Sequence, residues 1–596
     1  MKGQKIVILG INPSHNTSAA ILVDGKIVAA CQEERFSRKK NHIGLPLKSI
    51  DYCLQTAGVS INEIDWLTVA GRTHFFYLSI IRDADLKQSN NLLKLDAVFR
   101  WFRYGFVHEL AYRIPPLGLI DFLMEEILER TVKRLGRKKY KKLLVELLKV
   151  DPKKIVFIKH HEAHSAWSYF SSGFAGSKDS TLTFCLDGGG DGVVSSLWLG
   201  KGSKMKLIAS TPWHKSLGYL YLYTTYYLGL KPIEDEYKVM GLAPYANSQK
   251  VEELTVKLRP FIKIDKRRLV FDSPINTNVF HKYLPSIYQR QRFDVISGAI
   301  QKLTEETIYE WVDIAVKRYK VGQITTGGGV FANVKCNKVI LEIKNIKKVF
   351  FAPSPGDETN AMGACFWQYS QVYSKLPEPL NDIYLGPQAF EIDIKNAIKQ
   401  ARQSGFKVTK LKKPSEVIAR LLAEGNVIAR VVGRMEFGAR ALGNRSILAD
   451  PSHLEIKDEI NKSIKSRDFW MPFAPVILSE HTSEYLKNSK GVESAYMMVA
   501  FETTPKGALD LAAAVHPYDK TARAQILTRD VNNDYYDMVK EFGRLTGRWG
   551  LLNTSFNLHG EPIVLTPEDA LHTLENSDLK YLQIENYLIA KKEVSG

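Results

Sequence analysis

The alternation of apolar and polar residues near the start of the chain predicts a strand, a polar loop and a β-hairpin. An apolar run at residues 5–9 precedes a polar loop at 10–16, and two further apolar runs cover residues 18–23 and 26–31. Asp24-Gly25 separates the last two runs, and Asp-Gly between apolar segments is typical of a tight hairpin turn. We therefore expect antiparallel strands on either side of this dipeptide.

A similar unit recurs later in the chain and indicates a duplication. The strand-like residues 182–186 lead into a glycine-rich loop at 187–192 and a second strand-like run at 193–199. Another glycine loop, residues 325–329, follows the strand-like residues 322–324. Turn chemistry explains each loop by itself, yet the backbone N–H groups of such loops can also approach phosphate closely. Three loops in this order predict a duplicated α/β nucleotide site.

The length of 596 residues predicts at least two domains, because one hydrophobic core does not grow to that size. We expect one domain at residues 1–375, with a mostly helical insertion at about 75–148. A proline-rich and polar stretch at 376–388 predicts a linker. Residues 389–596 then alternate between helical and strand-like patterns, including a helix near 392–403 and a strand near 427–432, which predicts a second α/β domain.

Composition points to a cytoplasmic protein. The five cysteines are far apart and form no C-x-x-C pair, so we expect free, mostly buried thiols in a reducing compartment: Cys31, Cys53, Cys185, Cys336 and Cys365. The first residues pass directly into a strand-like run, so no signal peptide is expected. Charges and prolines interrupt the most apolar stretches, so no membrane span or membrane partner is expected either.

The formal charge is +18, and a dense basic run at residues 130–142 contributes much of it. Such an excess is compatible with nucleic acid, anionic membranes or phosphorylated substrates. The run lacks the interleaved aromatics and glycines of common RNA motifs. We therefore interpret it as a solvated helix face and expect no nucleic-acid partner.

A histidine cluster, His160-His161-Glu162-Ala163-His164, is the strongest candidate for a metal site. Residues four apart share one face of a helix, so His160 and His164 could bind one ion together. The cluster does not complete the H-E-x-x-H pattern of zinc proteases, because Ser165 stands where that pattern requires histidine. Asp357, between a strand-like run and a helix, is the candidate third ligand, although an Asp there could equally be an N-cap. Two imidazoles and a carboxylate suit a catalytic centre with open positions.

Arginines are interspersed with glycines in the second half of the chain, between Gly433 and Arg445. Guanidinium groups in such loops suit a polyanionic ligand, because they bond phosphate bidentately. A solvated charge run is the alternative, but few acidic partners accompany these arginines. The candidates for a phosphate site are Arg434, Arg440, Arg445, Lys465, Arg467 and Arg523, with the polar loop Asn553, Ser555 and Asn557.

Taken together, these motifs resemble the O-carbamoyltransferase family of nodulation, antibiotic and toxin biosynthesis enzymes, over nearly the whole chain. The matching stretches are residues 10–18 with His15, Gln32-Glu33-Glu34-Arg35-Phe36-Ser37-Arg38, 160–164, 187–192, 238–243, 327–333, 356–357, 433–451, 465–475, 552–557 and 560–562. The resemblance implies an actin/Hsp70-like, duplicated ribonuclease-H-type N-terminal domain related to the tRNA threonylcarbamoyl-transferase subunit. It also implies a C-terminal α/β twisted-sheet domain like the enzyme that makes threonylcarbamoyl-adenylate.

The activity implied by the resemblance is an ATP-dependent carbamoyl transfer in two steps. The C-terminal domain converts carbamoyl phosphate and ATP into carbamoyl-adenylate, and the N-terminal domain passes the carbamoyl group to a hydroxyl of a small-molecule natural product. A metal on His160, His164 and Asp357, iron(II) or another divalent ion, serves the transfer, and Mg²⁺ is left open as a further ion. A homodimer is expected, as is usual among relatives.

Roles for the remaining residues follow from the same resemblance. His15 is a candidate base for the acceptor hydroxyl, Lys238 a phosphate partner, and Arg440 and Arg445 catalytic charge stabilisers. The residues expected to hold the adenylate are Asp187, Gly188, Gly189, Gly190, Asp191, Gly327, Gly328, Gly329 and Asn333. The chain departs from the family at Asn16, where Asp is usual, and at Met471, where Arg is common.

Three other functions fit parts of the pattern. A tRNA-modifying enzyme would use the same adenylate chemistry with threonine and bicarbonate. A non-catalytic actin-like nucleotide-binding protein would not need the His160/His164 pair. A sugar kinase of the same superfamily would not need the arginine-rich second domain. The identity of the acceptor, be it an aminoglycoside, macrolide, oligosaccharide or alkaloid toxin, is not encoded in these motifs.

Overall fold

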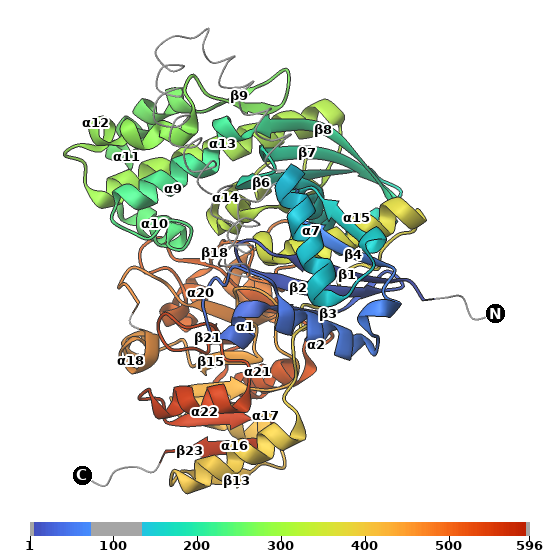
Figure 1. The fold of residues 1–596 in the computed structure, drawn as a ribbon. Helices are drawn as coiled ribbons and strands as arrows, with labels where there is room; N and C mark the ends of the chain where they lie inside the picture. Colours follow the sequence, from blue (N-terminus) through green and yellow to red (C-terminus); the bar gives the residue numbers. More distant parts are fainter. Residues whose placement is uncertain (1–4, 73–133, 466, 592–596) are drawn as a thin grey trace.

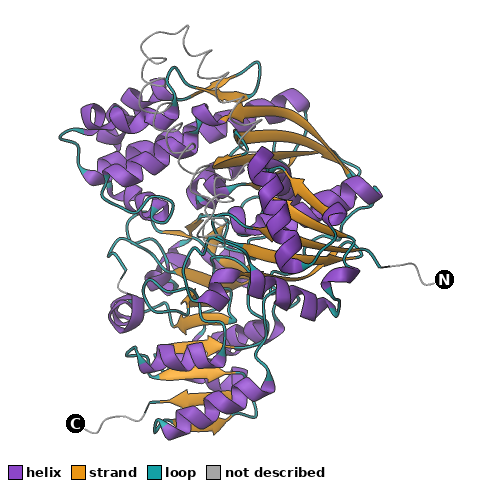
Figure 2. Cartoon of the chain, viewed as in Figure 1, coloured by secondary structure: helices purple, strands orange, loops and turns teal. Residues whose placement is uncertain are grey.

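A computed structural model describes residues 5–72, 134–465 and 467–591 (Figure 1). Within these residues the chain forms three larger sheets and two small ones, with helices packed between and around them (Figure 2). The first sheet has the order β3-β2-β1-β4-β5. Its strands are β1 (Val7–Asn12), β2 (Ser18–Val23), β3 (Lys26–Gln32), β4 (Trp66–Ala70) and β5 (Ile155–Ile158).

The expected hairpin at Asp24-Gly25 is confirmed. Strands β2 and β3 pair antiparallel on either side of the dipeptide. Both turn residues have positive φ, 50° at Asp24 and 92° at Gly25. This conformation suits the right-handed twist of the flanking strands, and Asp and Gly tolerate it better than most residues. Strand β1 pairs antiparallel with β2 but parallel with β4, and β4 pairs parallel with β5.

The second sheet repeats this arrangement. Its order is β8-β7-β6-β11-β12, with two antiparallel pairs followed by two parallel pairs. The strands are β6 (Thr181–Gly190), β7 (Val193–Lys201), β8 (Lys204–Pro212), β11 (Gln323–Gly327) and β12 (Lys348–Phe351). The equal strand order and pairing confirm the duplicated α/β architecture predicted from the recurring loops.

Two equivalent helices lie between the repeats. Helix α8 (His160–Ser171) follows β5, and α15 (Asn360–Tyr373) follows β12. Trp167 of α8 stacks on Phe366 of α15, with ring centroids 6.1 Å apart. Gly363 allows the close crossing, because a Cβ there would overlap the Ala163 carbonyl group. The two helices therefore hold the two sheets in a fixed relation, and the loops that enter them lie near each other.

Helices also extend the second repeat. They are α9 (Leu217–Tyr227), α10 (Glu236–Leu242), α11 (Ser248–Leu258), α12 (Leu284–Tyr288), α13 (Phe293–Tyr319) and α14 (Val334–Leu341). Helix α2 (Leu47–Ala57) packs on the first sheet, and a short α1 (Glu33–Ser37) precedes it. Most of the expected helical insertion at 75–148 lies outside the described residues, and its final part is helix α7 (Arg134–Leu148).

The C-terminal half contains an eight-stranded mixed sheet of order β13-β23-β22-β14-β15-β21-β16-β20. Its strands are β13 (Lys407–Lys410), β14 (Ile428–Val431), β15 (Arg445–Ala449), β16 (Ala474–Leu478), β20 (Gln525–Leu527), β21 (Gly550–Ser555), β22 (Tyr581–Ile584) and β23 (Tyr587–Ala590). Helices α16 (Glu391–Gln403), α18 (Glu455–Ile460) and α22 (Pro567–Glu575) pack in one apolar cluster with it. Helices α17 (Pro414–Ala423) and α21 (Asn533–Thr546) form another.

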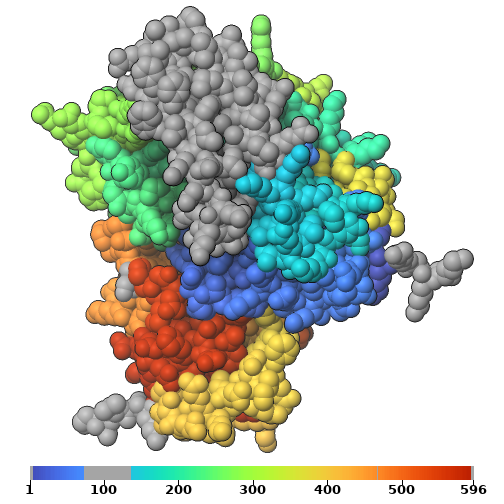
Figure 3. Space-filling model, viewed as in Figure 1, coloured from blue at the N-terminus to red at the C-terminus, as the bar shows by residue number. Residues whose placement is uncertain are grey.

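The stretch expected as a linker has no helix or strand, but it is not loosely attached. Ile383, Tyr384 and Leu385 are buried in a cluster that also contains Phe437 and Leu442 of the C-terminal half. The two halves are in direct contact, and blue and green atoms lie against orange and red ones in Figure 3. The boundaries at 375 and 389 stay a prediction. None of the described helices is long and apolar enough to cross a membrane.

Candidate metal centre and anion site

The two predicted metal-binding histidines lie at the start of α8, on one face of its first turn. The helix starts directly after β5, and the Glu162 side chain accepts a hydrogen bond from the backbone N–H of Lys159, the residue before the first turn. His160 Nε2 and His164 Nε2 are 3.1 Å apart, and both side chains are almost completely buried. His161 points elsewhere, because its ring bonds the Ser196 hydroxyl and the Val193 carbonyl oxygen. The structure therefore separates the histidines as the i, i+4 spacing predicts.

Two carboxylates from the second repeat complete the cluster. Asp357, just before α15, places Oδ1 3.4 Å from Nε2 of both histidines. Asp187, at the end of β6, places Oδ2 2.8 Å from His160 Nε2 and 3.6 Å from His164 Nε2. The glycine loop led us to expect Asp187 in the nucleotide site, whereas the structure brings it into the histidine cluster. Sequence spacing gave no direct signal that Asp187 joins the histidines, since Asp187 lies 23 positions after His164.

The electrostatics of the cluster favour a cation. Burial opposes charge on His164, but hydrogen bonds and attraction from Asp187 and Asp357 outweigh it and raise the pKa of His164 to about 9. Burial would raise the pKa of Asp187, yet the two histidines hold it well below its usual range. Two negative carboxylates thus face two imidazole nitrogens in a site with little access to water, and uncompensated charge there is costly.

These four side chains fit a divalent metal ion. One ligand atom from each of His160, His164, Asp187 and Asp357 lies within 4.8 Å of all the others. Two neutral imidazoles and two carboxylates carry a charge of −2 and offer N and O ligands of the kind that iron(II) and zinc accept. The donor set therefore agrees with the metal expected from the resemblance and adds one ligand to it.

Nearby glycines make room for this cluster. A Cβ at Gly190 would overlap the His160 ring, and one at Gly329 would lie 2.9 Å from Asp187 Oδ1. Gly328 has φ of +92°, and a Cβ there would overlap the Leu186 backbone. Both glycine loops therefore border the histidine–carboxylate cluster, and this requirement for space accounts for their composition.

Neighbouring polar groups orient the candidate ligands. Ser14 Oγ, in the first loop, donates to Asp357 Oδ2 at 3.3 Å, and Asn360 Nδ2 lies 3.2 Å from His164 Nε2. Neither residue was among the sequence candidates, although Ser14 lies within a matching motif. The adjacent His15 is half-buried, next to a residue that bonds a candidate ligand. Its position is compatible with contact to a ligand, and its role as a base stays a prediction.

The side chains of Asp191 and Asn333 form hydrogen bonds within the protein. Asp191 accepts hydrogen bonds from the backbone N–H groups of Arg72 and His160. Asn333 caps α14 through the N–H groups of Lys335 and Cys336 and bonds Gln301 in both directions. These contacts position the two loops, and the expected contact of either residue to an adenylate stays a prediction.

A second cluster consists of arginine side chains. It lies in the C-terminal half of the chain, where that half contacts the N-terminal half. Arg440, Arg467 and Arg523 are close enough for their charges to interact, and burial followed by this repulsion lowers the pKa of Arg523 well below its usual range. Burial likewise lowers the pKa of Arg467 to about 10, and Tyr237 of α10 is the largest opposing influence. Within the described part of the chain, no hydrogen bond or ion pair is found for Arg440 or Arg523. All three arginines are only partly exposed, and a partly buried group of like charges without acidic partners is stabilised by an anion.

Lys465 adds a fourth positive side chain to this cluster and contacts the loop at the end of β21. Its Nζ donates to Asn557 Oδ1 at 2.8 Å and to Ser555 Oγ at 3.2 Å, while Arg467 donates to Thr554 Oγ1 at 2.9 Å. The structure thus brings together five of the expected groups, with Thr554 as an addition: Arg440, Arg467, Arg523, Lys465 and the Ser555/Asn557 loop. Figure 1 shows this region of orange and red strands below the blue sheet.

Three expected contacts are not part of the anion cluster. Arg434 donates to the carbonyl oxygens of Val28, Leu385 and Gly386. Arg445 is fully buried and donates to five carbonyl oxygens, those of Val432, Gly433, Asn444, Leu565 and Pro387. Asn553 donates to the Ala441 carbonyl oxygen. These side chains bind carbonyl oxygens of the protein backbone, and their expected contacts to phosphate stay a prediction.

Lys238 lies at the junction of the two halves. Its Nζ is 3.1 Å from Asp468 and 3.4 Å from Asp235, and its carbonyl oxygen accepts from Trp470 Nε1. Met471 packs beside Gly241 of the same helix, α10. Lys238 is therefore paired with Asp235 of its own half and with Asp468 across the junction, next to Tyr237 and the arginine cluster.

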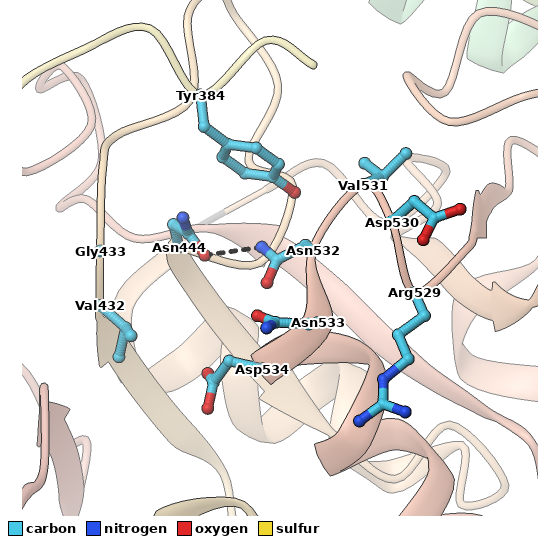
Figure 4. A pocket seen from close by; sticks show the side chains of 10 residues that line it. All are labelled: Tyr384, Val432, Gly433, Asn444, Arg529, Asp530, Val531, Asn532, Asn533 and Asp534. Atoms are coloured by element: carbon cyan, nitrogen blue, oxygen red, sulfur yellow. Dashed lines mark hydrogen bonds between the residues drawn. The ribbon is translucent and has the colours of Figure 1, made fainter. Parts of the chain in front are cut away.

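A separate cavity of about 670 Å³ lies at the end of β14 and the start of α21 (Figure 4). Two of its polar side chains bond each other, since Asn532 Nδ2 donates to Asn444 Oδ1 at 2.9 Å. Asp530 and Asp534 give part of its wall negative charge. None of the expected site residues lines it, so it is distinct from both clusters.

The fold and the two clusters define a two-part α/β protein with one site suited to a divalent cation and another suited to an anion. Residues 7–366 match the model of the carbamoyltransferase N-terminus, and residues 419–591 match that of the carbamoyltransferase C-terminus. The chain belongs to the carbamoyltransferase family and is a transferase enzyme, as the sequence motifs predicted.

Relatives extend over nearly the whole chain. The nodulation protein NolNO of Sinorhizobium fredii is 32% identical over 591 residues, covering 98% of this chain and 80% of its own length. The protein MJ1051 of Methanocaldococcus jannaschii is 31% identical and covers 98% of this chain and all of its own length. A crystal structure of T. kodakarensis HypF aligns with 62% of this chain and 48% of its own at 12% identity and a TM-score of 0.30.

Proposed function

We propose that the protein makes carbamoyl-adenylate from carbamoyl phosphate and ATP at the arginine cluster and transfers the carbamoyl group to a hydroxyl at the histidine–carboxylate cluster. The acceptor is a small-molecule natural product, and the working form is a homodimer. The observation that carries the proposal is the presence of two chemically different sites in one chain of the carbamoyltransferase family. A divalent cation suits one site and a polyanion suits the other.

The arginine cluster suits the first reaction. Water first hydrolyses carbamoyl phosphate to carbamate and inorganic phosphate. A carbamate oxygen then attacks the α-phosphorus of ATP, and the bond from that phosphorus to pyrophosphate breaks. Negative charge on the phosphate oxygens increases in that step, and Arg440, Arg467 and Arg523 provide guanidinium groups without competing acidic partners. Fixed positive groups in a partly buried site stabilise such charge.

The histidine–carboxylate cluster suits the second reaction. His160, His164, Asp187 and Asp357 would hold the metal, preferably iron(II), which when bound polarises the carbamoyl or phosphate oxygen as a Lewis acid. Ser14 holds Asp357 in place. His15 is the proposed base that takes the proton of the acceptor hydroxyl, while the oxygen bonds the carbamoyl carbon and AMP leaves.

Two assays test this division. With ATP and carbamoyl phosphate, the wild-type protein should release pyrophosphate, and Arg440→Ala should suppress that release. His164→Ala should lose metal and carbamoyl transfer but still release pyrophosphate. Loss of both reactions in a folded His164→Ala protein would contradict the two-site assignment.

The acceptor requires a separate screen. Hydroxyl compounds from the aminoglycoside, macrolide, oligosaccharide and alkaloid classes should be supplied with ¹⁴C-carbamoyl phosphate, ATP and iron(II). Label in one of these products supports the proposal, whereas label in tRNA with threonine and bicarbonate would favour the tRNA-modifying alternative. Light scattering of the purified protein tests the homodimer.

A further inference from the structure

The motif Gln32-Glu33-Glu34-Arg35-Phe36-Ser37-Arg38 has no part in either cluster, yet it connects the two halves of the chain. Arg35 is almost completely buried at the start of the first repeat. Its guanidinium pairs with Glu34 at 2.8 Å and donates to Gln32 Oε1 at 3.0 Å. The same group donates to the carbonyl oxygen of Gly438 at 2.7 Å, two residues before Arg440.

Gly438 is held from its other side by the loop that carries Asp357. It has φ of +103°, and a Cβ there would overlap the hydroxyl of Ser354. Both the backbone conformation and the lack of space require glycine at this position. Through Gly438, the loop of Arg440 therefore packs between Arg35 and Ser354.

Ser354 continues the connection toward the metal candidate. Its hydroxyl donates a short hydrogen bond to Glu358 Oε1, and Glu358 is buried next to Asp357. The Glu358 carbonyl oxygen accepts from Ser18 at the start of β2, which fixes this segment to the first sheet. The charge of Glu358 also acts on Arg440. A continuous set of contacts thus joins Arg35, Gly438, Ser354, Glu358 and Asp357.

We propose that Arg35 is a positioning residue that holds the Gly438–Arg440 loop against Ser354, so that anion binding at the arginine cluster and metal binding at Asp357 strengthen each other. The inference rests on the proposed function, because it assumes that both clusters bind their ligands. A packed contact with no free space transmits a shift of one loop to the other. Such coupling is reciprocal, and its free energy is the same whichever ligand binds first.

The test measures binding alone. Co²⁺ is titrated by calorimetry with and without sulfate, an anion that scarcely chelates the metal, at ionic strength held constant with NaCl. Sulfate should tighten Co²⁺ binding by about fivefold or more, within the usual range for coupled sites. Co²⁺ should tighten sulfate binding by the same factor.

Variants separate positioning from general stability. Arg35→Met and Ser354→Ala should still bind both ions but bring the coupling factor close to one. Arg38→Ala is the matched control, because Arg38 also joins the two halves, through the carbonyl oxygens of Pro562 and Ile563, without touching the Gly438 loop. It should keep the wild-type factor. Thermal melting confirms that each variant is folded.

Several results would overturn the inference. A coupling factor of one in the wild-type protein, an unchanged factor in both Arg35→Met and Ser354→Ala, or an equal loss in Arg38→Ala would each do so. Independent binding of both ions would leave the proposed function intact. Failure of the wild-type protein to bind Co²⁺ at all would contradict the metal centre and the proposed function as well.

Discussion

His160 and Asp357 occupy equivalent places in the two repeats, and their Nε2 and Oδ1 atoms lie 3.4 Å apart. Each stands where the last parallel strand of its sheet passes into a helix, β5 into α8 and β12 into α15. Because α8 and α15 cross closely, the duplicated fold brings these two positions together. The candidate metal centre is thus built at the junction of the repeats.

Gly190→Ala should weaken metal binding, because the added methyl group would overlap the His160 ring. Displaced metal ligands and their supports typically cost about 10- to 100-fold in affinity. The matched control is Gly188→Ala, two residues away, where an added Cβ meets no atom within 4 Å. Calorimetric titration with Co²⁺ compares the two, and equal affinities would show that His160 is not a ligand.

Asp187→Asn should distinguish a metal ligand from a nucleotide contact. The substitution keeps the size of the side chain but removes one of the two negative charges that face His160 and His164. We expect weaker Co²⁺ binding and unchanged release of pyrophosphate from ATP and carbamoyl phosphate. Normal metal binding together with loss of pyrophosphate release would instead show that Asp187 contacts the nucleotide.

Arg445→Met and Arg440→Met should have contrasting effects on stability. Arg445 is completely buried and serves five carbonyl oxygens, and each buried polar group left without a partner costs about 1–3 kcal/mol. Its replacement should lower the unfolding midpoint markedly. Arg440→Met should leave the midpoint near that of the wild type while abolishing sulfate binding. Urea unfolding and calorimetry make the comparison, and a stable Arg445→Met protein would contradict it.

Anion binding should be accompanied by proton uptake near Lys465. Burial, and then repulsion by Arg467, lower the pKa of Lys465 well below its usual range. A bound anion stabilises the charged ammonium and raises this pKa again, so protons are taken up at pH values between the two. Because binding takes up protons, sulfate affinity should fall as pH rises through this interval. Titrations in buffers of different ionisation enthalpy count the protons, and Lys465→Met should take up fewer.

Much of the secondary structure around the sites could be predicted because it depends on local patterns. The hairpin over β2 and β3 follows from Asp24-Gly25 between apolar runs. The strand before His160 and the helix after it follow from the change in apolar period, and α16 and β14 lie within two residues of their predicted bounds. Helical spacing likewise places His160 and His164 on one face, apart from His161.

The membership of each site could not be read from spacing. Arg440 and Arg445 are only five residues apart in one glycine-rich loop, yet the first has no partner among the described residues and the second is saturated by carbonyl oxygens. A guanidinium binds whichever acceptors the fold supplies, and those include residues more than one hundred positions away, such as Leu565. Likewise, no local pattern shows that Arg434 meets the carbonyl oxygen of Val28.

The sequence by itself determined the repeated strand–loop units, the pair of helical histidines, the surplus of arginines in the second half and the family. These are properties of nearest neighbours along the chain and of motif order. Only the tertiary structure decided that Asp187 joins His160, His164 and Asp357, and that Arg35 reaches Gly438 beside the arginine cluster. Such contacts arise when distant segments pack, because burial brings their charged and polar groups to within bonding distance and leaves no solvent to replace them.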